Sequence, residues 1–215
     1  LEHKLRALDE GAPLGFLDAL ASKAPTPGGG SAAALAGAMS AALGAMVGRL
    51  TAGRSRFADV RDEVRELIVE AEKLRQTLTE GMEEDAAAFN AVMAAYKLPK
   101  GTEKEKAARH AATQKAMTRA AEVPLETARQ VLRAMEIALV MARKGNPNAV
   151  TDAASAVWLG MAALQSAALN VRINATSIDD QERARTWLDE LDGILTRADS
   201  ILAQAQATAV ERGGL

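Results

Sequence analysis

A glycine-rich loop followed by an uncharged stretch constrains this chain more than any other feature. The loop runs from Pro25 to Ser31 and holds two prolines and three consecutive glycines, so it cannot lie inside a helix or a strand. No charged residue occurs between Lys23 and Arg49. The segment from Ala32 to Gly48 is built mostly of Ala, Gly, Leu and Met, which predicts a tightly packed helix that is buried on all sides.

The loop has two interpretations, and its sequence alone does not decide between them. Ser31 is a candidate N-cap for the helix that follows, and the backbone amides of Gly28, Gly29 and Gly30 would then face outward. Amides at a helix start are a ready site for an anion or a polar ligand. The alternative is a hinge before a closely packed helix, since glycine-rich loops are common punctuation.

A membrane span is a third interpretation of the uncharged stretch, and Gly44 and Gly48 form a GxxxG pair. The prolines and glycines at its start shorten the apolar span below the ~20 residues that a bilayer requires. We therefore expect no membrane association.

The remaining chain has the periodicity of helices and no convincing strand alternation. Apolar residues make up 48% of the chain but aromatic residues only 3%, which favours close helix packing. The sequence predicts an all-α bundle of about six to seven helices, including two or three long ones, without a sheet, in a single domain over residues 1–215. The expected helices cover 13–22, 32–52, 57–96, 102–122, 124–144, 150–177 and 180–212.

Charge and cysteine content exclude several classes of function. The formal net charge is −2, so the chain lacks the overall basic field of a nucleic-acid-binding protein. The absence of cysteine excludes disulfides and cysteine-based metal or nucleophilic sites and fits a cytoplasmic protein. The histidines, His3 and His110, have no metal-ligand spacing, so we expect no metal. The segment Leu1–Lys4 predicts a charged amphipathic start rather than a signal peptide.

Asp85 is an anomaly within the long helix expected over 57–96. It falls on the apolar stripe of that helix, where an apolar residue is expected. A buried carboxylate at such a position is a candidate for general acid or base work. The alternative is an interior aspartate paired with Lys, Arg or backbone donors.

Small polar residues form a narrow stripe along the helix expected over 150–177. Asn170 and Asn174 are one turn apart and can act together. Asp152 shares their face but lies 18 residues from Asn170, roughly 27 Å along a straight helix. These groups would need an elongated ligand or a neighbouring subunit to act together. The alternative is that the Asn and Ser side chains bond across helix contacts.

Several motifs resemble the cyclodeaminase family, which comprises the C-terminal domain of formiminotransferase-cyclodeaminase and its stand-alone bacterial relatives. The similarity is in register over about 30–174, and together the motifs are specific. The motifs are PTPGGGSA from Pro25, ALGAMV from Ala42, DAAAF from Asp85, LPK from Leu98, VPL from Val123, GN at Gly145, Asp152, and NVRIN from Asn170.

The resemblance implies an all-helical homodimer or larger assembly that acts on a tetrahydrofolate derivative as its substrate, with no tightly bound cofactor. Cyclodeaminases convert 5-formiminotetrahydrofolate to 5,10-methenyltetrahydrofolate and ammonia, a step of one-carbon metabolism and histidine degradation. Similar stand-alone proteins are methenyltetrahydrofolate cyclohydrolases. We place the cyclodeaminase reaction first and the cyclohydrolase second, and a non-catalytic folate-binding or scaffold protein remains a further alternative.

The resemblance also implies roles for individual residues. Asp85 and Asp152 are the candidates for acid and base work. Asn170 and Asn174 would hold polar edges of the pterin or of the one-carbon group, and Lys100 and the glycine amides would take a glutamate carboxylate. The candidate substrate-binding residues are Gly28, Gly29, Gly30, Ser31, Lys100, Asn170 and Asn174.

Overall fold

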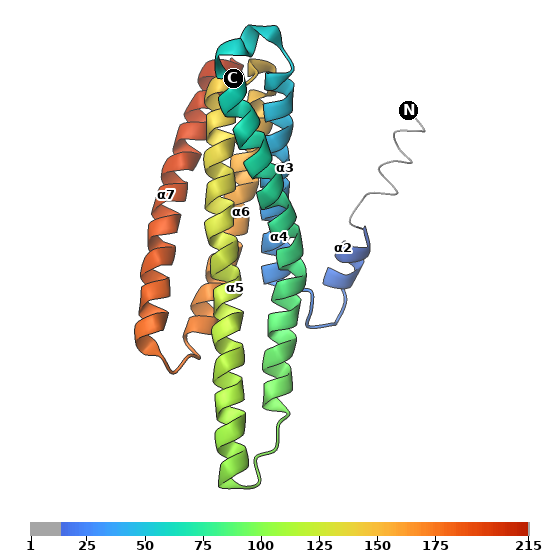
Figure 1. Ribbon diagram of the computed structural model, residues 1–215, viewed down its shortest axis with the longest axis vertical. Helices are drawn as coiled ribbons and strands as arrows, with labels where there is room; N and C mark the ends of the chain where they lie inside the picture. The colour runs from blue at the N-terminus through green and yellow to red at the C-terminus, as the bar shows by residue number, and fades with distance from the viewer. Residues whose placement is uncertain (1–13, 215) are drawn as a thin grey trace.

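A computed structural model describes residues 14–214 as six α-helices, and no strand occurs in that range. This confirms the all-α prediction. Figure 1 shows the five long helices running roughly side by side along the long axis, while the short helix Leu14–Leu20 lies apart from them. The predicted helix start at Pro13 and the segment Leu1–Lys4 lie outside the described residues. The helices are α2 (Leu14–Leu20), α3 (Gly29–Ala52), α4 (Arg61–Tyr96), α5 (Glu103–Lys144), α6 (Val150–Ala175) and α7 (Gln181–Gly213).

Helix α3, in which Arg49 is the one charged residue, contacts α4, α5 and α6. It is not buried on all sides as the sequence predicted, because Met39 and Leu50 are more than two-fifths exposed. Its small residues let neighbouring helices approach closely. A methyl group at Gly37 would overlap Val131 of α5, and one at Gly48 would overlap Ile68 of α4. The cores on either side of α3 are rich in alanine, so packing here depends on short side chains rather than on large ones.

Helix α5 differs from the sequence prediction, which had one helix end near residue 122 and another begin at Pro124. The structure has one helix of 42 residues with Pro124 inside it. Its start is as predicted, because Thr102 and Glu105 form a capping box. Burial of Val123, Pro124 and Leu125 against neighbouring helices offsets the lost backbone hydrogen bond, so tertiary packing overrides the local helix breaker.

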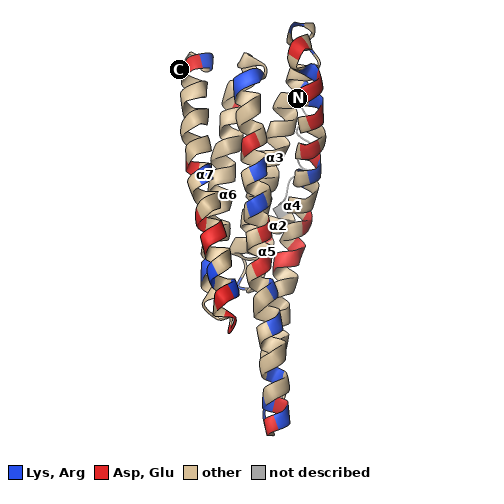
Figure 2. Cartoon of the chain, turned by 60° about the vertical axis from the view of Figure 1, so that its left-hand side comes forward, with Lys and Arg blue, Asp and Glu red and all other residues tan. Residues whose placement is uncertain are grey.

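Helices α4 and α5 form an antiparallel hairpin that projects beyond the turn between α6 and α7 (Figure 1). Higher in the bundle, Arg133 of α5 makes a two-pronged ion pair with Glu70 of α4, with both N–O distances at 2.7 Å. The hydrogen bond from Arg133 holds the pKa of Glu70 below its usual value, although partial burial acts in the opposite direction. Figure 2 shows the charged residues spread along α4, α5 and α7, while α3 is almost bare of them.

Two helical segments are long and apolar enough to cross a membrane by composition, Gly29–Ala52 and Pro147–Ala175. About half of each apolar window is buried inside the bundle. Core helices of soluble proteins have the same property, so their composition alone does not indicate a membrane span.

Candidate active site

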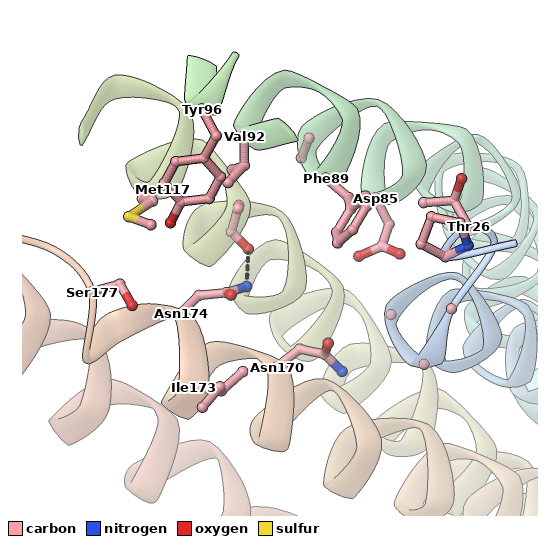
Figure 3. Close-up of a pocket in the computed structure, with 16 residues that line it drawn as sticks. Thr26, Asp85, Phe89, Val92, Tyr96, Met117, Asn170, Ile173, Asn174 and Ser177 are labelled. Atoms are coloured by element: carbon pink, nitrogen blue, oxygen red, sulfur yellow. Dashed lines mark hydrogen bonds between the residues drawn. The ribbon is translucent and has the colours of Figure 1, made fainter. Parts of the chain in front are cut away.

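A cavity of about 430 Å³ lies where the glycine loop meets α4, α5 and α6 (Figure 3). It brings together residues as far apart in the sequence as Pro25 and Ser177. The lining residues are Pro25, Thr26, Gly28, Gly29, Gly30, Asp85, Ala88, Phe89, Val92, Tyr96, Met117, Ala120, Asn170, Ile173, Asn174 and Ser177. Six of the nine candidate residues therefore share one cavity: Gly28, Gly29, Gly30, Asp85, Asn170 and Asn174.

The Asp85 carboxylate lies against the first turn of α3. Its Oδ2 accepts a hydrogen bond of 2.9 Å from the hydroxyl of Ser31. A methyl group at Gly30 would overlap the carboxylate, so the absence of a side chain there makes the approach possible. No ion pair to Asp85 is found within residues 14–214, so the hydroxyl of Ser31, rather than a cation, holds this carboxylate.

Ser31 does not cap α3 as the sequence predicted. The N-cap position is Gly28, and it makes no side-chain capping bond. Because α3 begins at Gly29, the prediction that the whole segment 25–31 lies outside a helix is wrong: Gly29, Gly30 and Ser31 form the first turn of α3. Ser31 lies one turn further on, is fully buried, and its hydroxyl is 3.0 Å from the carbonyl oxygen of Met82 as well as within reach of Asp85. It therefore lies behind the cavity wall and contacts Asp85 instead of lining the cavity itself.

Gly28, Gly29 and Gly30 line the cavity, but a side chain is sterically excluded at only one of these three positions. Methyl groups at Gly28 and Gly29 would meet their nearest neighbours at 3.6 Å, an ordinary contact. All three have negative φ values, so no left-handed backbone conformation requires glycine here. The feature that excludes a side chain is the position of the Asp85 carboxylate beside Gly30.

Asn170 and Asn174 approach the cavity from α6 with their amide nitrogens already in use. Asn170 Nδ2 donates to the carbonyl of Ser166 at 2.9 Å, and Asn174 Nδ2 donates to the carbonyl of Ala120 at 2.7 Å. A carbonyl only accepts, so each amide must turn its NH₂ group toward the carbonyl. Each side chain is left with its oxygen as the group that can receive a donor from a ligand.

The apolar wall of the cavity was missed in the sequence analysis. Phe89, Val92 and Tyr96 follow Asp85 along one face of α4, and Met117 and Ile173 face them from α5 and α6 (Figure 3). The helical spacing shows which α4 residues share a face, but it was interpreted as a core stripe. The same spacing together with Asp85 is the signal that could have identified this wall.

Besides Ser31, two further candidate residues do not line this cavity. Asp152 is half-buried in the first turn of α6, at the opposite end of that helix from Asn170. Lys100 lies beyond the end of α4 in a second cavity of about 360 Å³, with Lys106, Arg109 and His110. Tyr96 lines both cavities, so the basic second cavity adjoins the first.

No group of three or more His, Cys, Asp or Glu side chains suited to a metal ion occurs among the described residues. The lining of the cavity supplies a carboxylate, amide oxygens, backbone amides and an apolar wall.

The fold and this cavity define an all-helical enzyme that acts on a small molecule. The model of the formiminotransferase-cyclodeaminase family matches residues 14–193. The chain belongs to this family, which confirms the resemblance stated from its motifs.

Relatives with different reactions are found by sequence and by structure. The chain is 47% identical over 186 residues to methenyltetrahydrofolate cyclohydrolase of Methylorubrum extorquens, covering 86% of this chain and 89% of that protein. It is 34% identical over 171 residues to the formimidoyltransferase-cyclodeaminase of Gallus gallus. That match covers 79% of this chain but only 32% of the chicken protein, so the chain spans about a third of that relative.

A solved structure has the same fold. Formiminotetrahydrofolate cyclodeaminase from Thermotoga maritima superposes with a TM-score of 0.83 at 29% sequence identity. The superposition covers 94% of this chain and 96% of that one. The family is thus established, and the choice between its reactions is a separate question.

Proposed function

We propose that this protein is a methenyltetrahydrofolate cyclohydrolase, which opens 5,10-methenyltetrahydrofolate with water to give 10-formyltetrahydrofolate. The observation that carries the proposal is the Asp85 carboxylate, held at the cavity wall by Ser31 without a cationic partner in the described chain. A relative that is 47% identical over nearly its full length has this name, which favours this reaction over the cyclodeaminase reaction placed first from the sequence.

Asp85 would act as the general base. Water adds to the methenyl carbon between N5 and N10, and the carboxylate takes a proton from that water. The hydroxyl of the tetrahedral intermediate then loses its proton as the carbon–oxygen double bond forms, the bond from carbon to N5 breaks, and N5 takes up a proton. The formyl group is left on N10. The overall reaction consumes one water and releases one proton, so it needs no oxidant or reductant.

The remaining lining residues match the parts of a folate. The oxygens of Asn170 and Asn174 are acceptors for the ring N–H and amino groups of a pterin. Phe89, Val92 and Tyr96 offer an apolar surface to the aromatic rings. A cavity of about 430 Å³ is within the range of pockets for small organic ligands.

The glutamate carboxylates of the folate would reach the second cavity. Lys100 and Arg109 form no ion pair within residues 14–214, whereas Lys106 pairs with Glu103 and His110 with Asp179. Two cations without carboxylate partners therefore adjoin the first cavity through Tyr96.

The second candidate is formimidoyltetrahydrofolate cyclodeaminase, which the superposition on the Thermotoga maritima enzyme favours. In that reaction N10 attacks the formimino carbon and ammonia leaves, and the same carboxylate would take and return the proton. Because nucleophile and electrophile are on one molecule, holding the folate in a bent conformation would supply much of the acceleration.

A homodimer is part of this proposal. The outer face of α6 presents Trp158, Ala162, Leu169 and Ile173, which lie at helical spacing. Three of them are large and at least half exposed: Trp158 at 50%, Leu169 at 67% and Ile173 at 65%. Because Ile173 also lines the first cavity, a second copy on this face would reach the cavity rim. Sedimentation of the purified protein measures its mass directly, and a strictly monomeric protein would contradict this part.

Supplying each folate separately and following methenyl absorbance tests the function. A cyclohydrolase consumes 5,10-methenyltetrahydrofolate faster than the buffer does, whereas a cyclodeaminase generates it from 5-formiminotetrahydrofolate with release of ammonia. Activity on the second substrate alone would overturn the first proposal in favour of the second. Folate binding without turnover of either would indicate the non-catalytic alternative.

A further inference from the structure

Pro124 lies in the interior of α5, one turn after Ala120. Proline has no backbone N–H, so the carbonyl of the residue four positions earlier has no helical donor. That residue is Ala120, whose carbonyl lines the first cavity. Pro124 therefore leaves an unused acceptor at the cavity wall.

Asn174 of α6 uses this acceptor. Its Nδ2 donates to the Ala120 carbonyl at 2.7 Å, a bond between residues 54 positions apart in the sequence (Figure 3). Asn170 provides a contrast, because its Nδ2 bonds the carbonyl of Ser166 within its own helix. Of the two asparagines, Asn174 is the one that bonds a neighbouring helix. The carbonyl that it bonds is the one that Pro124 leaves without a helical N–H donor.

We propose that Pro124 is a positioning residue that acts through Asn174. By withholding an N–H from Ala120, it directs the Asn174 NH₂ group to α5 and turns the amide oxygen toward the cavity. The identity of the substrate group that donates to this oxygen depends on the proposed function. The orientation of the Asn174 side chain does not depend on it. The proline thus aims the amide oxygen of Asn174, an acceptor, into the cavity, while one of the two N–H groups of the amide is held by α5.

A structural role and a positioning role for Pro124 predict opposite effects of Pro124→Ala on the melting temperature and on KM. Pro124→Ala supplies the N–H that Ala120 lacks, and it removes a residue that disfavours helix interiors. We therefore expect the melting temperature to stay constant or to rise. The new N–H competes with Asn174 for the carbonyl, so KM should rise roughly tenfold while kcat changes less.

A double-mutant cycle shows whether the effect passes through Asn174. Asn174→Ala should raise KM by a similar factor, and adding Pro124→Ala to it should have little further effect. Val123→Ala is the matched control, because it truncates the neighbouring buried residue without adding a donor. It should lower the melting temperature and leave KM unchanged. Effects that multiply in the double variant would overturn the proposal, as would a Pro124→Ala variant that is less stable and has normal KM.

The side-chain amide signals of Asn174 in a ¹⁵N-labelled sample give a readout that needs no turnover. In the wild-type protein we expect two separated proton signals, one of them protected from exchange by the Ala120 carbonyl. This protection should be lost in Pro124→Ala and kept in Val123→Ala, and retention in both would overturn the proposal. Loss of protection in a protein that turns over neither folate would sustain the positioning role while the proposed function failed.

Discussion

The hydroxyl of Ser31 donates a hydrogen bond of 2.9 Å to Asp85 Oδ2, and this bond joins the first turn of α3 to the middle of α4. It explains why a serine follows the three glycines. The glycine beside it leaves room for the carboxylate, and the serine holds that carboxylate in place. The loop is thus a support for one acidic side chain as well as a wall of the cavity.

Asp85→Asn should lower kcat by at least roughly a hundredfold, because an amide keeps the shape of the carboxylate but cannot take a proton from water. Steady-state assays with 5,10-methenyltetrahydrofolate measure the loss, and circular dichroism checks that the bundle is intact. Glu83→Gln is the matched control, since it removes the same charge from an exposed position two residues away. A kcat within threefold of the wild-type value would remove Asp85 from the chemistry.

Gly30→Ala should destabilise the protein by about 1–3 kcal/mol and reduce kcat, because the added methyl group and the Asp85 carboxylate cannot occupy the same space. Gly29→Ala is the steric control, since its methyl group would lie 3.6 Å from Asn170 Nδ2. Chemical denaturation of both variants tests the difference. Equal stability of the two would show that the carboxylate can move away at no cost.

Asp152→Asn should change kcat by less than Asp85→Asn, because Asp152 lies at the far end of α6 from the cavity. The same methenyl assay compares the two variants. A loss as large as that of Asp85→Asn would indicate instead that a second copy brings its own Asp152 to the cavity. Measuring mass and activity together over a dilution series would then show whether the site is complete within one copy or needs Asp152 of a second copy.

Arg133→Gln should destabilise the fold by up to about 1 kcal/mol at pH 7, a modest figure because both partners of the Glu70 pair are about two-fifths exposed. The pKa of Glu70 is lowered in the folded protein, mainly by the hydrogen bond from Arg133. The pair therefore stabilises the fold above the usual carboxyl pKa, and this contribution is lost as the pH falls through the lowered value. Denaturation curves at several pH values should show the difference between variant and wild type shrinking on acidification, and a constant difference would contradict this account.

The helix α3 begins three residues before its predicted start, and Ser55–Val60 forms a separate 3₁₀ helix before α4. Most of the helices could nevertheless be predicted from the sequence, because caps, turns and apolar periodicity are local signals. The capping box at Thr102 and the turn after Gly145 are examples. Pro124 was interpreted as a helix boundary because its local effect is to break helices, whereas packing around it depends on residues far away in the sequence.

The candidate site was harder to predict than the fold. Periodicity along α4 shows that Asp85, Phe89 and Tyr96 share a face, but it does not say whether a neighbouring helix covers that face. Placing Lys100 required the length of the α4–α5 hairpin, which carries it past the first cavity into the second. The separation of Asp152 from Asn170 was predictable, because both lie on one helix of known rise.

The projecting end of the α4–α5 hairpin has a lower local stability than the rest of the bundle. None of the α5 residues from 103 to 115 is fully buried, and the first buried one is Ala116. A segment with so few buried contacts opens at a lower free-energy cost than the core, so its amide hydrogens exchange with solvent first. Tyr96 and Met117 stand at the base of this segment and form one wall of the cavity. Fraying of the hairpin would therefore loosen that wall while α3 and α6 stayed folded, and it would open the interior of the cavity without global unfolding.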